Sequence, residues 1–171
     1  YNMKDFCIVG SGISGSTIAN LLSKKYTIEV FDKARGVGGR ASSRRFKEGT
    51  YFDHGTQYIS PKDKIFKKFT LKLITKKILK KWPGIHFNLS SVQKKHGDKL
   101  IGQRGNNHIS KYLLKGLKIN TKLKIINITF LGNKWEITLE NAKKLYFKNL
   151  ILTCPYPQLK TLAAKYLPAP I

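Results

Sequence analysis

The stretch Gly10-Ser11-Gly12-Ile13-Ser14-Gly15 decides the fold class of this chain. Residues 6–9 before it are apolar and β-branched, residues 13–24 after it have the spacing of a helix, and residues 27–31 have the composition of a second strand. Strand, glycine turn, helix and strand within 32 residues form a βαβ unit. In that context the G-x-G-x-x-G pattern predicts a Rossmann-type dinucleotide site.

Each position of this motif has a physical role. Gly10 allows the tight turn, Gly12 lets the backbone approach a pyrophosphate, and Gly15 lets helix and strand pack closely. The helix N-terminus offers free N–H groups and a partial positive charge to the phosphates. Asp32 follows Gly10 by 22 residues, at the end of the second strand, where a carboxylate can accept hydrogen bonds from ribose hydroxyls.

A second glycine pair, Gly38-Gly39, lies shortly after Asp32 and is followed by Arg40. This element is not part of the plain nicotinamide-binding pattern. The glycines let backbone amides face a phosphate, and Arg40 adds a charge-assisted hydrogen bond. We therefore predict that FAD, rather than NAD, is the tightly held cofactor.

The chain has 171 residues, of which 33 are Lys or Arg and 9 are Asp or Glu, giving a formal net charge of +24. Of the basic residues 28 are Lys, and Ile and Asn are also plentiful, so an A/T-rich genome is one explanation of the charge; an anionic partner is the other. Because arginine is the residue that reads guanine edges, this composition argues against sequence-specific nucleic-acid recognition.

Composition excludes several further classes. The hydrophobic fraction of 41% is enough for a packed core and excludes a disordered tail. No apolar run approaches the ~18–20 residues that span a bilayer. With two cysteines, no visible secretory signal and four scattered histidines, we expect a cytoplasmic protein with neither a disulfide scaffold nor a metal site.

The rest of the chain alternates helices and strands. Lys62–Lys81 contains nine lysines, and Ile65, Phe66, Phe69 and Leu73 recur at helical spacing, just as Ile18, Leu21 and Leu22 do in the first helix. We predict a solvated lysine face there. The expected elements are helices over 62–74, 107–115 and 157–165, strands over 78–82, 146–147 and 150–153, short strands with turns at 88–91 and 97–98, and a hairpin over 122–139 that turns at Gly132-Asn133.

Three segments resemble a known family: GSGISG at 10–15, FDKARGVGGR at 31–40 and FDHGTQY at 52–58. This is the pattern of the FAD-dependent amine-oxidase superfamily, and within it the chain is most similar to the renalase-like proteins. The tryptophan-bearing segment 133–137 and the strand-to-proline segment 150–158 narrow the resemblance.

The resemblance implies an α/β fold: an FAD-binding Rossmann-type domain with a β-hairpin insertion, plus the beginning of a mixed α+β substrate domain. We expect residues 1–55 and 103–171 to form the FAD-binding domain and residues 56–102 the partial substrate domain. Since family members run to roughly twice this length, the chain looks like the N-terminal half of such a protein.

The resemblance also assigns roles by position. The cofactor-binding residues it implies are Gly10, Gly12, Ile13, Ser14 and Gly15 for the pyrophosphate, Asp32 with Lys33 for the adenosine ribose, Gly39 and Arg40 for the phosphates or ribityl chain, Gln57 and Tyr58 beside the isoalloxazine, and the Ile125 backbone for the adenine.

The function implied is an FAD-dependent oxidoreductase that acts on a small molecule. A renalase-like enzyme passes hydride from a reduced nicotinamide dinucleotide isomer to flavin and then to oxygen. No compelling general base stands out, and a dihydropyridine donor does not need one. An amine or carotenoid-type oxidoreductase of the same superfamily is an alternative, and a basic binding module without turnover is another.

Overall fold

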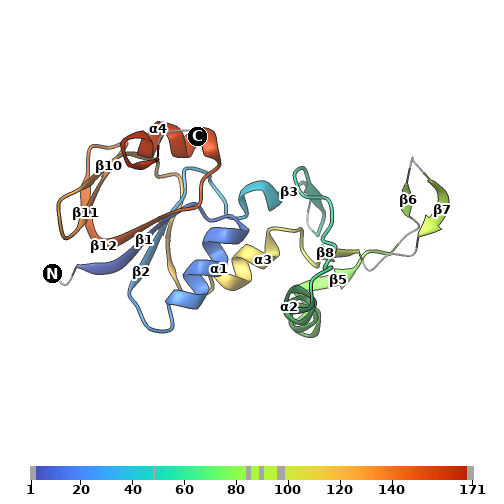
Figure 1. Cartoon of the computed structure of the whole chain (residues 1–171). Helices are drawn as coiled ribbons and strands as arrows, with labels where there is room; N and C mark the ends of the chain where they lie inside the picture. Colours follow the sequence, from blue (N-terminus) through green and yellow to red (C-terminus); the bar gives the residue numbers. More distant parts are fainter. Residues whose placement is uncertain (1–2, 48, 84–85, 89–90, 96–98, 169–171) are drawn as a thin grey trace.

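The computed structural model describes residues 3–47, 49–83, 86–88, 91–95 and 99–168 (Figure 1). The helices are α1 (Ile13–Leu22), α2 (Lys64–Thr75), α3 (His108–Leu113) and α4 (Tyr156–Ala163), with 3₁₀ turns η1 (Gly39–Ala41) and η2 (Ala164–Tyr166). The strands are β1 (Lys4–Val9), β2 (Ile28–Phe31), β3 (Ser43–Arg45), β4 (Tyr51–Asp53), β5 (Leu79–Lys81), β6 (His86–Asn88), β7 (Ser91–Lys95), β8 (Leu100–Gly102), β9 (Lys118–Asn120), β10 (Ile125–Phe130), β11 (Trp135–Leu139) and β12 (Lys144–Leu152).

A six-stranded sheet in the order β10-β11-β12-β1-β2-β9 organises the larger part of the molecule. The strands β12, β1, β2 and β9 run parallel, while β10, β11 and β12 form an antiparallel meander. The strand β1 therefore has β2 on one side and β12, whose paired residues come 143 positions later in the chain, on the other, with Val9 beside both Phe31 and Leu152. This confirms the mixed α/β fold with a parallel sheet.

The two faces of the sheet carry separate cores. Side chains alternate along a strand, so the neighbours Cys7 and Ile8, both fully buried, point to opposite faces. Ile8 packs with Ala19 of α1 and with Leu114 after α3, while Cys7 packs with the meander and Ala163 of α4. The sheet is thus covered by α1 and α3 on one side and by α4 on the other (Figure 1).

A third core lies beside the sheet, among α2, β5, β8 and α3. Leu73 of α2, Leu79 of β5 and Leu100 of β8 are almost fully buried there, together with Ile109 of α3. Since α3 also contacts α1, it connects this smaller core to the sheet. The nine lysines of the predicted run are all exposed, as a solvated face requires.

Three expectations about individual elements were wrong. The segment 144–152 is one strand rather than two, because its first half pairs with β11 and its second half with β1; the polar pair Lys148-Asn149 in its middle contacts Asp5 instead of ending the strand. Leu21 is 59% exposed, since α1 faces the sheet with the small residues Gly15, Ser16 and Ala19.

The exposed side chains of α2 give the third correction. Ile65 is 80% exposed and Phe66 is 38% exposed, so only Phe69 and Leu73 of the expected apolar stripe reach the core. The centres of the turns expected at 88–91 and 97–98 lie outside the described residues. Within the described part of the chain, no helix has the length and hydropathy needed to cross a membrane.

Candidate functional site

A cleft of about 830 Å³ opens where three parallel strands end. Val9 ends β1, Phe31 ends β2 and Thr153 follows β12, and all three line the cleft. Ligands of open α/β sheets bind outside the carboxyl ends of the strands, between strands whose connections leave in opposite directions. The position and the size are those of a site for a large small-molecule ligand.

The two glycine segments of the sequence meet in this cleft. Gly12 and Gly38 form a parallel bridge, and the Gly38 N–H donates to the Ser11 carbonyl at 3.0 Å. Gly38 has φ +122° and Gly39 has φ +54°, in the left-handed region that favours glycine. The second glycine pair is therefore built onto the first turn rather than forming a separate loop.

Packing alone explains the first and last glycines of the motif. Gly10 has φ +105°, and a Cβ on Gly15 would lie 2.0 Å from the Gly10 carbonyl oxygen and 2.8 Å from Thr153 Oγ1. The close approach of α1 to the end of β1 therefore requires glycine at position 15.

Gly12 is different, because neither its conformation nor its neighbours require glycine. Its φ of −69° and ψ of −175° are open to any residue, and an added Cβ would come no closer than 3.7 Å to Gly39 Cα. Gly12 borders the cleft. The missing side chain therefore leaves room on the ligand side, as close approach of a pyrophosphate to the backbone demands.

The N-terminus of α1 faces the same space without a protein cap. Gly12 is the N-cap, no side chain caps the helix, and the first turn contains no acidic residue. Ile13, Ser14 and Gly15 all line the cleft. Uncapped N–H groups and the helix dipole favour an anion at this point.

Asp32 lines the cleft with most of its hydrogen-bonding capacity already used. Its Oδ2 accepts from the Ser11 N–H at 2.8 Å and from the Ser11 hydroxyl, and its Oδ1 accepts from the Ala34 N–H at 2.8 Å. A carboxylate has about four acceptor positions, so about one remains, on Oδ1. Asp32 thus both holds the first glycine turn and keeps an acceptor for one ligand hydroxyl.

Three cations line the cleft: Lys124, and the two that the sequence predicted, Lys33 and Arg40. Lys33 and Arg40 both line it and both are exposed. Neither takes part in an ion pair among the described residues. Uncompensated positive charge beside an uncapped helix N-terminus suits a ligand with two phosphates.

Apart from Lys124, the wall formed by residues 123–126 and α4 is mainly apolar. Ile125 of β10 is buried and lines the cleft, as do Leu123 before it and Pro157 and Leu162 of α4. Cys154 also lies here, where burial raises the pKa of its thiol although Lys33 lies nearby. The cleft therefore offers apolar contacts that suit a flat group beside its charged residues.

The structure brings together ten of the twelve residues predicted for the cofactor site, but not Gln57 and Tyr58. Thr56 is the last residue of that segment to line the cleft. The Tyr58 ring instead stacks on Trp82, with ring centroids 5.6 Å apart, and the Lys99 ammonium lies 4.1 Å from the centroid of the Tyr58 ring. Predicted residues that line the cleft are Gly10, Gly12, Ile13, Ser14, Gly15, Asp32, Lys33, Gly39, Arg40 and Ile125.

Sequence reasoning missed three residues that hold this site. Ser11 positions Asp32, and Thr153 packs against Gly10 and Gly15. Asn106 is fully buried: its Nδ2 donates to the carbonyls of Thr56 and Gln57, and its Oδ1 accepts from the Gly102 N–H at 2.7 Å. A serine between the motif glycines was a usable signal for Ser11, but nothing local marks Asn106, whose partners Thr56 and Gln57 lie about 50 residues away.

No group of three or more His, Cys, Asp or Glu among the described residues could hold a metal ion. The sheet, the paired glycine turns and the cleft at the strand ends define the class: a Rossmann-type dinucleotide-binding α/β protein. Residues 8–70 accordingly match the family described as an NAD(P)-binding Rossmann-like domain.

Comparison with individual proteins narrows the class. The chain is 31% identical to renalase of Mus musculus over 170 residues, which covers 92% of this chain and 48% of renalase. The chain thus spans about half the length of that relative, and the resemblance to renalase-like proteins expected from the sequence is confirmed.

Solved structures share the fold at low sequence identity. A putative protoporphyrinogen oxidase from Exiguobacterium sp. 255-15 matches with a TM-score of 0.72 and 12% identity, covering 95% of this chain and 62% of its own. A putrescine oxidase variant redesigned in cofactor binding matches with a TM-score of 0.71 and 13% identity, covering 97% and 61%. At these identities the likeness concerns the fold.

Proposed function

We propose that the cleft binds FAD and that the protein is an FAD-dependent oxidoreductase with renalase-like activity. The observation that carries the proposal is that two glycine turns meet at one cleft, where Gly12 has no side chain although its conformation and its protein neighbours would accept one. The similarity to renalase over most of the chain supports the same assignment.

The residues present fit each part of the cofactor. The α1 N-terminus and Gly12 suit the pyrophosphate, with Arg40 and Lys33 supplying charge. Asp32 has an acceptor for a ribose hydroxyl, and the backbone and side chain of Ile125 lie on the apolar wall that suits adenine. The proposal keeps Gln57 and Tyr58 beside the isoalloxazine, on the segment that leaves the cleft after Thr56.

When bound, FAD supplies a two-electron acceptor that takes a hydride and returns the electrons to oxygen as hydrogen peroxide. The chain's own residues bind and orient the cofactor and exclude water from it. Asn106 contributes by tethering the backbone carbonyls of Thr56 and Gln57, so that the segment entering the substrate side has one conformation.

For the substrate we propose a reduced nicotinamide dinucleotide isomer. A chain with a formal net charge of +24 attracts a pyrophosphate-bearing substrate and repels protonated amines, because steering depends on the field of the whole protein. A dihydropyridine also donates hydride without a strong base. We assign the substrate side to residues 56–102 and the cofactor side to residues 1–55 and 103–171.

Anaerobic mixing of the full-length flavoprotein with candidate substrates tests this proposal. Dihydronicotinamide isomers are expected to bleach the flavin absorbance in a single turnover, and admission of oxygen should restore it with release of hydrogen peroxide. Rapid bleaching by primary amines, with none by the dihydronicotinamide isomers, would show instead that the protein is an amine oxidase.

A further inference from the structure

A second concavity, of about 340 Å³, lies on the α3 side of the molecule and shares no lining residue with the FAD cleft. Its walls carry Arg45 from β3, Arg104 from the segment after β8, and His108, Lys111 and Lys115 from α3 and the turn that follows it. The remaining lining residues are two tyrosines and Ile78, so no acidic side chain of the described residues lines it.

This arrangement is not a scatter of surface lysines. His108 and Lys111 lie one turn apart on α3, and Lys115 follows in the turn after the helix. Two of the five arginines of the chain join them from other elements. An A/T-rich genome explains a high lysine content, but it does not explain why two arginines line the same concavity.

The cations lack compensating charge. None of Arg45, Arg104, Lys111 and Lys115 forms an ion pair among the described residues. The concavity therefore carries positive charge that no described acidic side chain neutralises, and a bound anion would relieve the repulsion among these cations.

The aromatic rings help to position these cations. The Arg45 guanidinium lies 5.8 Å from the centroid of Tyr51, and the ammonium of Lys76, which follows α2 and does not line the concavity, lies 5.9 Å from the centroid of Tyr112. Both tyrosines line the concavity, where their hydroxyls are hydrogen-bond donors. Arginine with its fixed fork and tyrosine with its hydroxyl are donors suited to phosphate oxygens.

We propose that this concavity is a second anion site, which binds the phosphate group of a small molecule independently of the cofactor. The pKa of His108 reflects the neighbouring cations. Burial and the neighbouring cations Arg104 and Lys111 lower the pKa of its imidazole, although a hydrogen bond with the Ile78 backbone opposes them. A bound phosphate would counteract the cations, so His108 reports on occupancy.

The test is a calorimetric titration of the full-length protein, with excess FAD present so that the cleft at the strand ends is filled, in about 0.15 M salt. Inorganic phosphate is one probe and adenosine monophosphate the other. We expect one saturable site for at least one of them. Equal affinity for the two probes indicates free phosphate as the ligand, and at least about tenfold tighter binding of the nucleotide indicates phosphate on a larger molecule.

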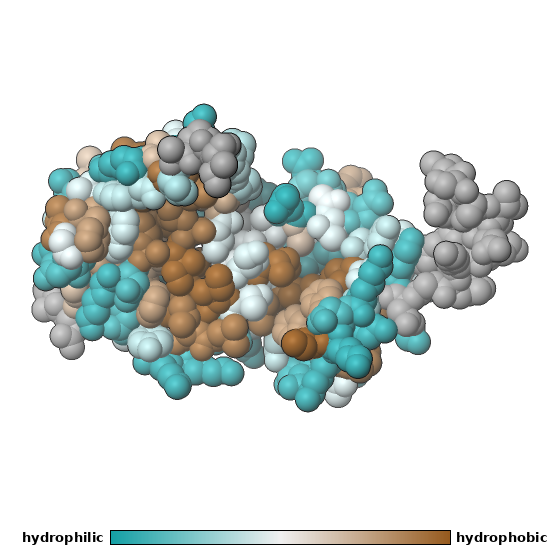
Figure 2. Space-filling model, in the orientation of Figure 1, coloured by the Kyte–Doolittle hydropathy of each residue, from teal (hydrophilic) through white to brown (hydrophobic). Residues whose placement is uncertain are grey.

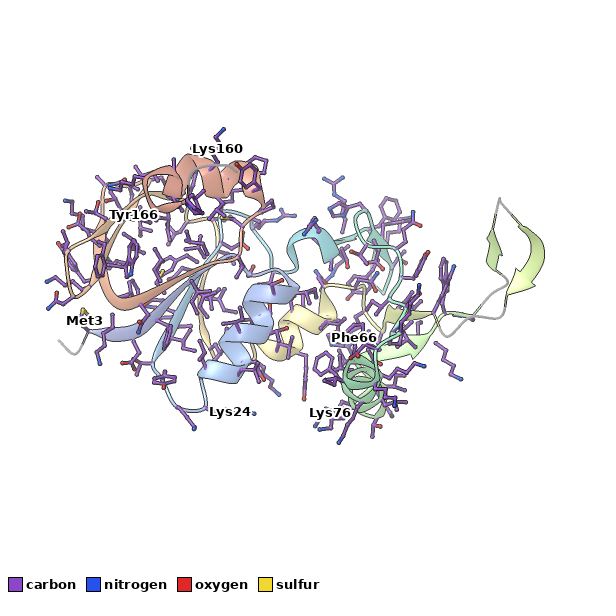
Figure 3. All side chains as sticks on the ribbon, viewed as in Figure 1. Met3, Lys24, Phe66, Lys76, Lys160 and Tyr166 are labelled. Carbon is purple, nitrogen blue, oxygen red and sulfur yellow. The ribbon has the colours of Figure 1, made fainter. Side chains whose placement is uncertain are left out.

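Matched variants locate the site. Lys111→Ala with Lys115→Ala should weaken binding by about tenfold or more, because each charge-assisted contact is lost. Lys24→Ala with Lys160→Ala removes the same charge from exposed positions on α4 and after α1, outside both cavities, and should change affinity by less than about twofold (Figure 3). Arg104→Lys keeps the charge but loses the fork, and should also weaken binding.

Nuclear magnetic resonance of His108 gives an independent readout. Its pKa should rise when phosphate is added to the parent protein and should not rise in the Lys111→Ala, Lys115→Ala variant. Equal loss of affinity in the two double variants, titrations that never saturate, or an unmoved His108 pKa at saturation would overturn the proposal.

Discussion

Replacement of Gly12 by alanine should separate cofactor binding from folding. Alanine is allowed at φ −69° and ψ −175°, and its Cβ would make only an ordinary contact, 3.7 Å from Gly39 Cα. Gly→Ala at a compatible position stabilises a protein by about 0.4–1 kcal/mol. Alanine is a poorer helix N-cap than glycine, by a comparable amount. The free energy of unfolding of the cofactor-free protein should therefore change by less than about 1 kcal/mol.

The effect on FAD should be much larger. The new methyl group enters the cleft where the backbone meets the pyrophosphate, and it holds the phosphates away from the α1 N-terminus. Loss of one or two charge-assisted hydrogen bonds costs about 1.5–3 kcal/mol each, so affinity should fall at least about tenfold to a hundredfold.

Two measurements on one set of proteins decide this. Urea unfolding of the cofactor-free protein gives stability, and quenching of FAD fluorescence gives affinity. Gly15→Ala is the contrasting variant: its Cβ would lie 2.0 Å from the Gly10 carbonyl oxygen, so it should lose about 3 kcal/mol of stability or more. If Gly12→Ala binds FAD within about twofold of the parent, or unfolds as easily as Gly15→Ala, the reasoning about the cleft is refuted.

Three further results are expected. Arg40→Ala should lower flavin affinity by about one to two orders of magnitude, measured by the same quenching, and retention of parental affinity would remove Arg40 from the site. Asn106→Ala should cost about 3 kcal/mol in urea unfolding, because the fully buried amide leaves a cavity and the buried Gly102 N–H loses its hydrogen bond; a loss below about 1 kcal/mol would contradict that. Burial opposes ionisation of Glu29, but contacts with Lys118, Lys4 and Asn120 outweigh burial and lower the pKa of this carboxyl below 4.5. The ionised Glu29 therefore stabilises the fold above about pH 4.5, and this stabilisation is lost as the pH falls below that value. Glu29→Gln should reduce the dependence of the unfolding free energy on pH between neutral and acid pH, and an unchanged dependence would argue against this role.

Much of the cofactor side follows from the first 40 residues of the sequence. The contacts there are local: the glycine motif, α1 and the end of β2 lie within one βαβ unit, so spacing alone brings Gly12 and Asp32 together. The sequence predicted that the Gly12 and Gly38 segments contact one ligand, but it did not predict the bridge between them, because residue types do not specify how two loops pair.

The remaining features depend on long-range packing. The strand β12 joins β11 to β1, and its polar residues Lys148 and Asn149 are explained only by their contacts with Asp5, which lies far away in the sequence. Likewise the exposed Ile65 and Phe66 satisfy a helical apolar pattern as well as Phe69 does, and only the position of the third core decides which face is buried. Figure 2 shows apolar surface over the sheet and α1 on one face of the molecule, which a linear pattern does not distinguish from core.

The most direct test of the central claim is the visible absorbance spectrum of the purified full-length protein, followed by identification of the cofactor that heat releases from it. The account predicts the two-banded spectrum of oxidised flavin, with one FAD released per chain and a marked loss of both in Gly12→Ala. A colourless protein that fails to take up added FAD, or one that releases only a nicotinamide dinucleotide, would contradict it.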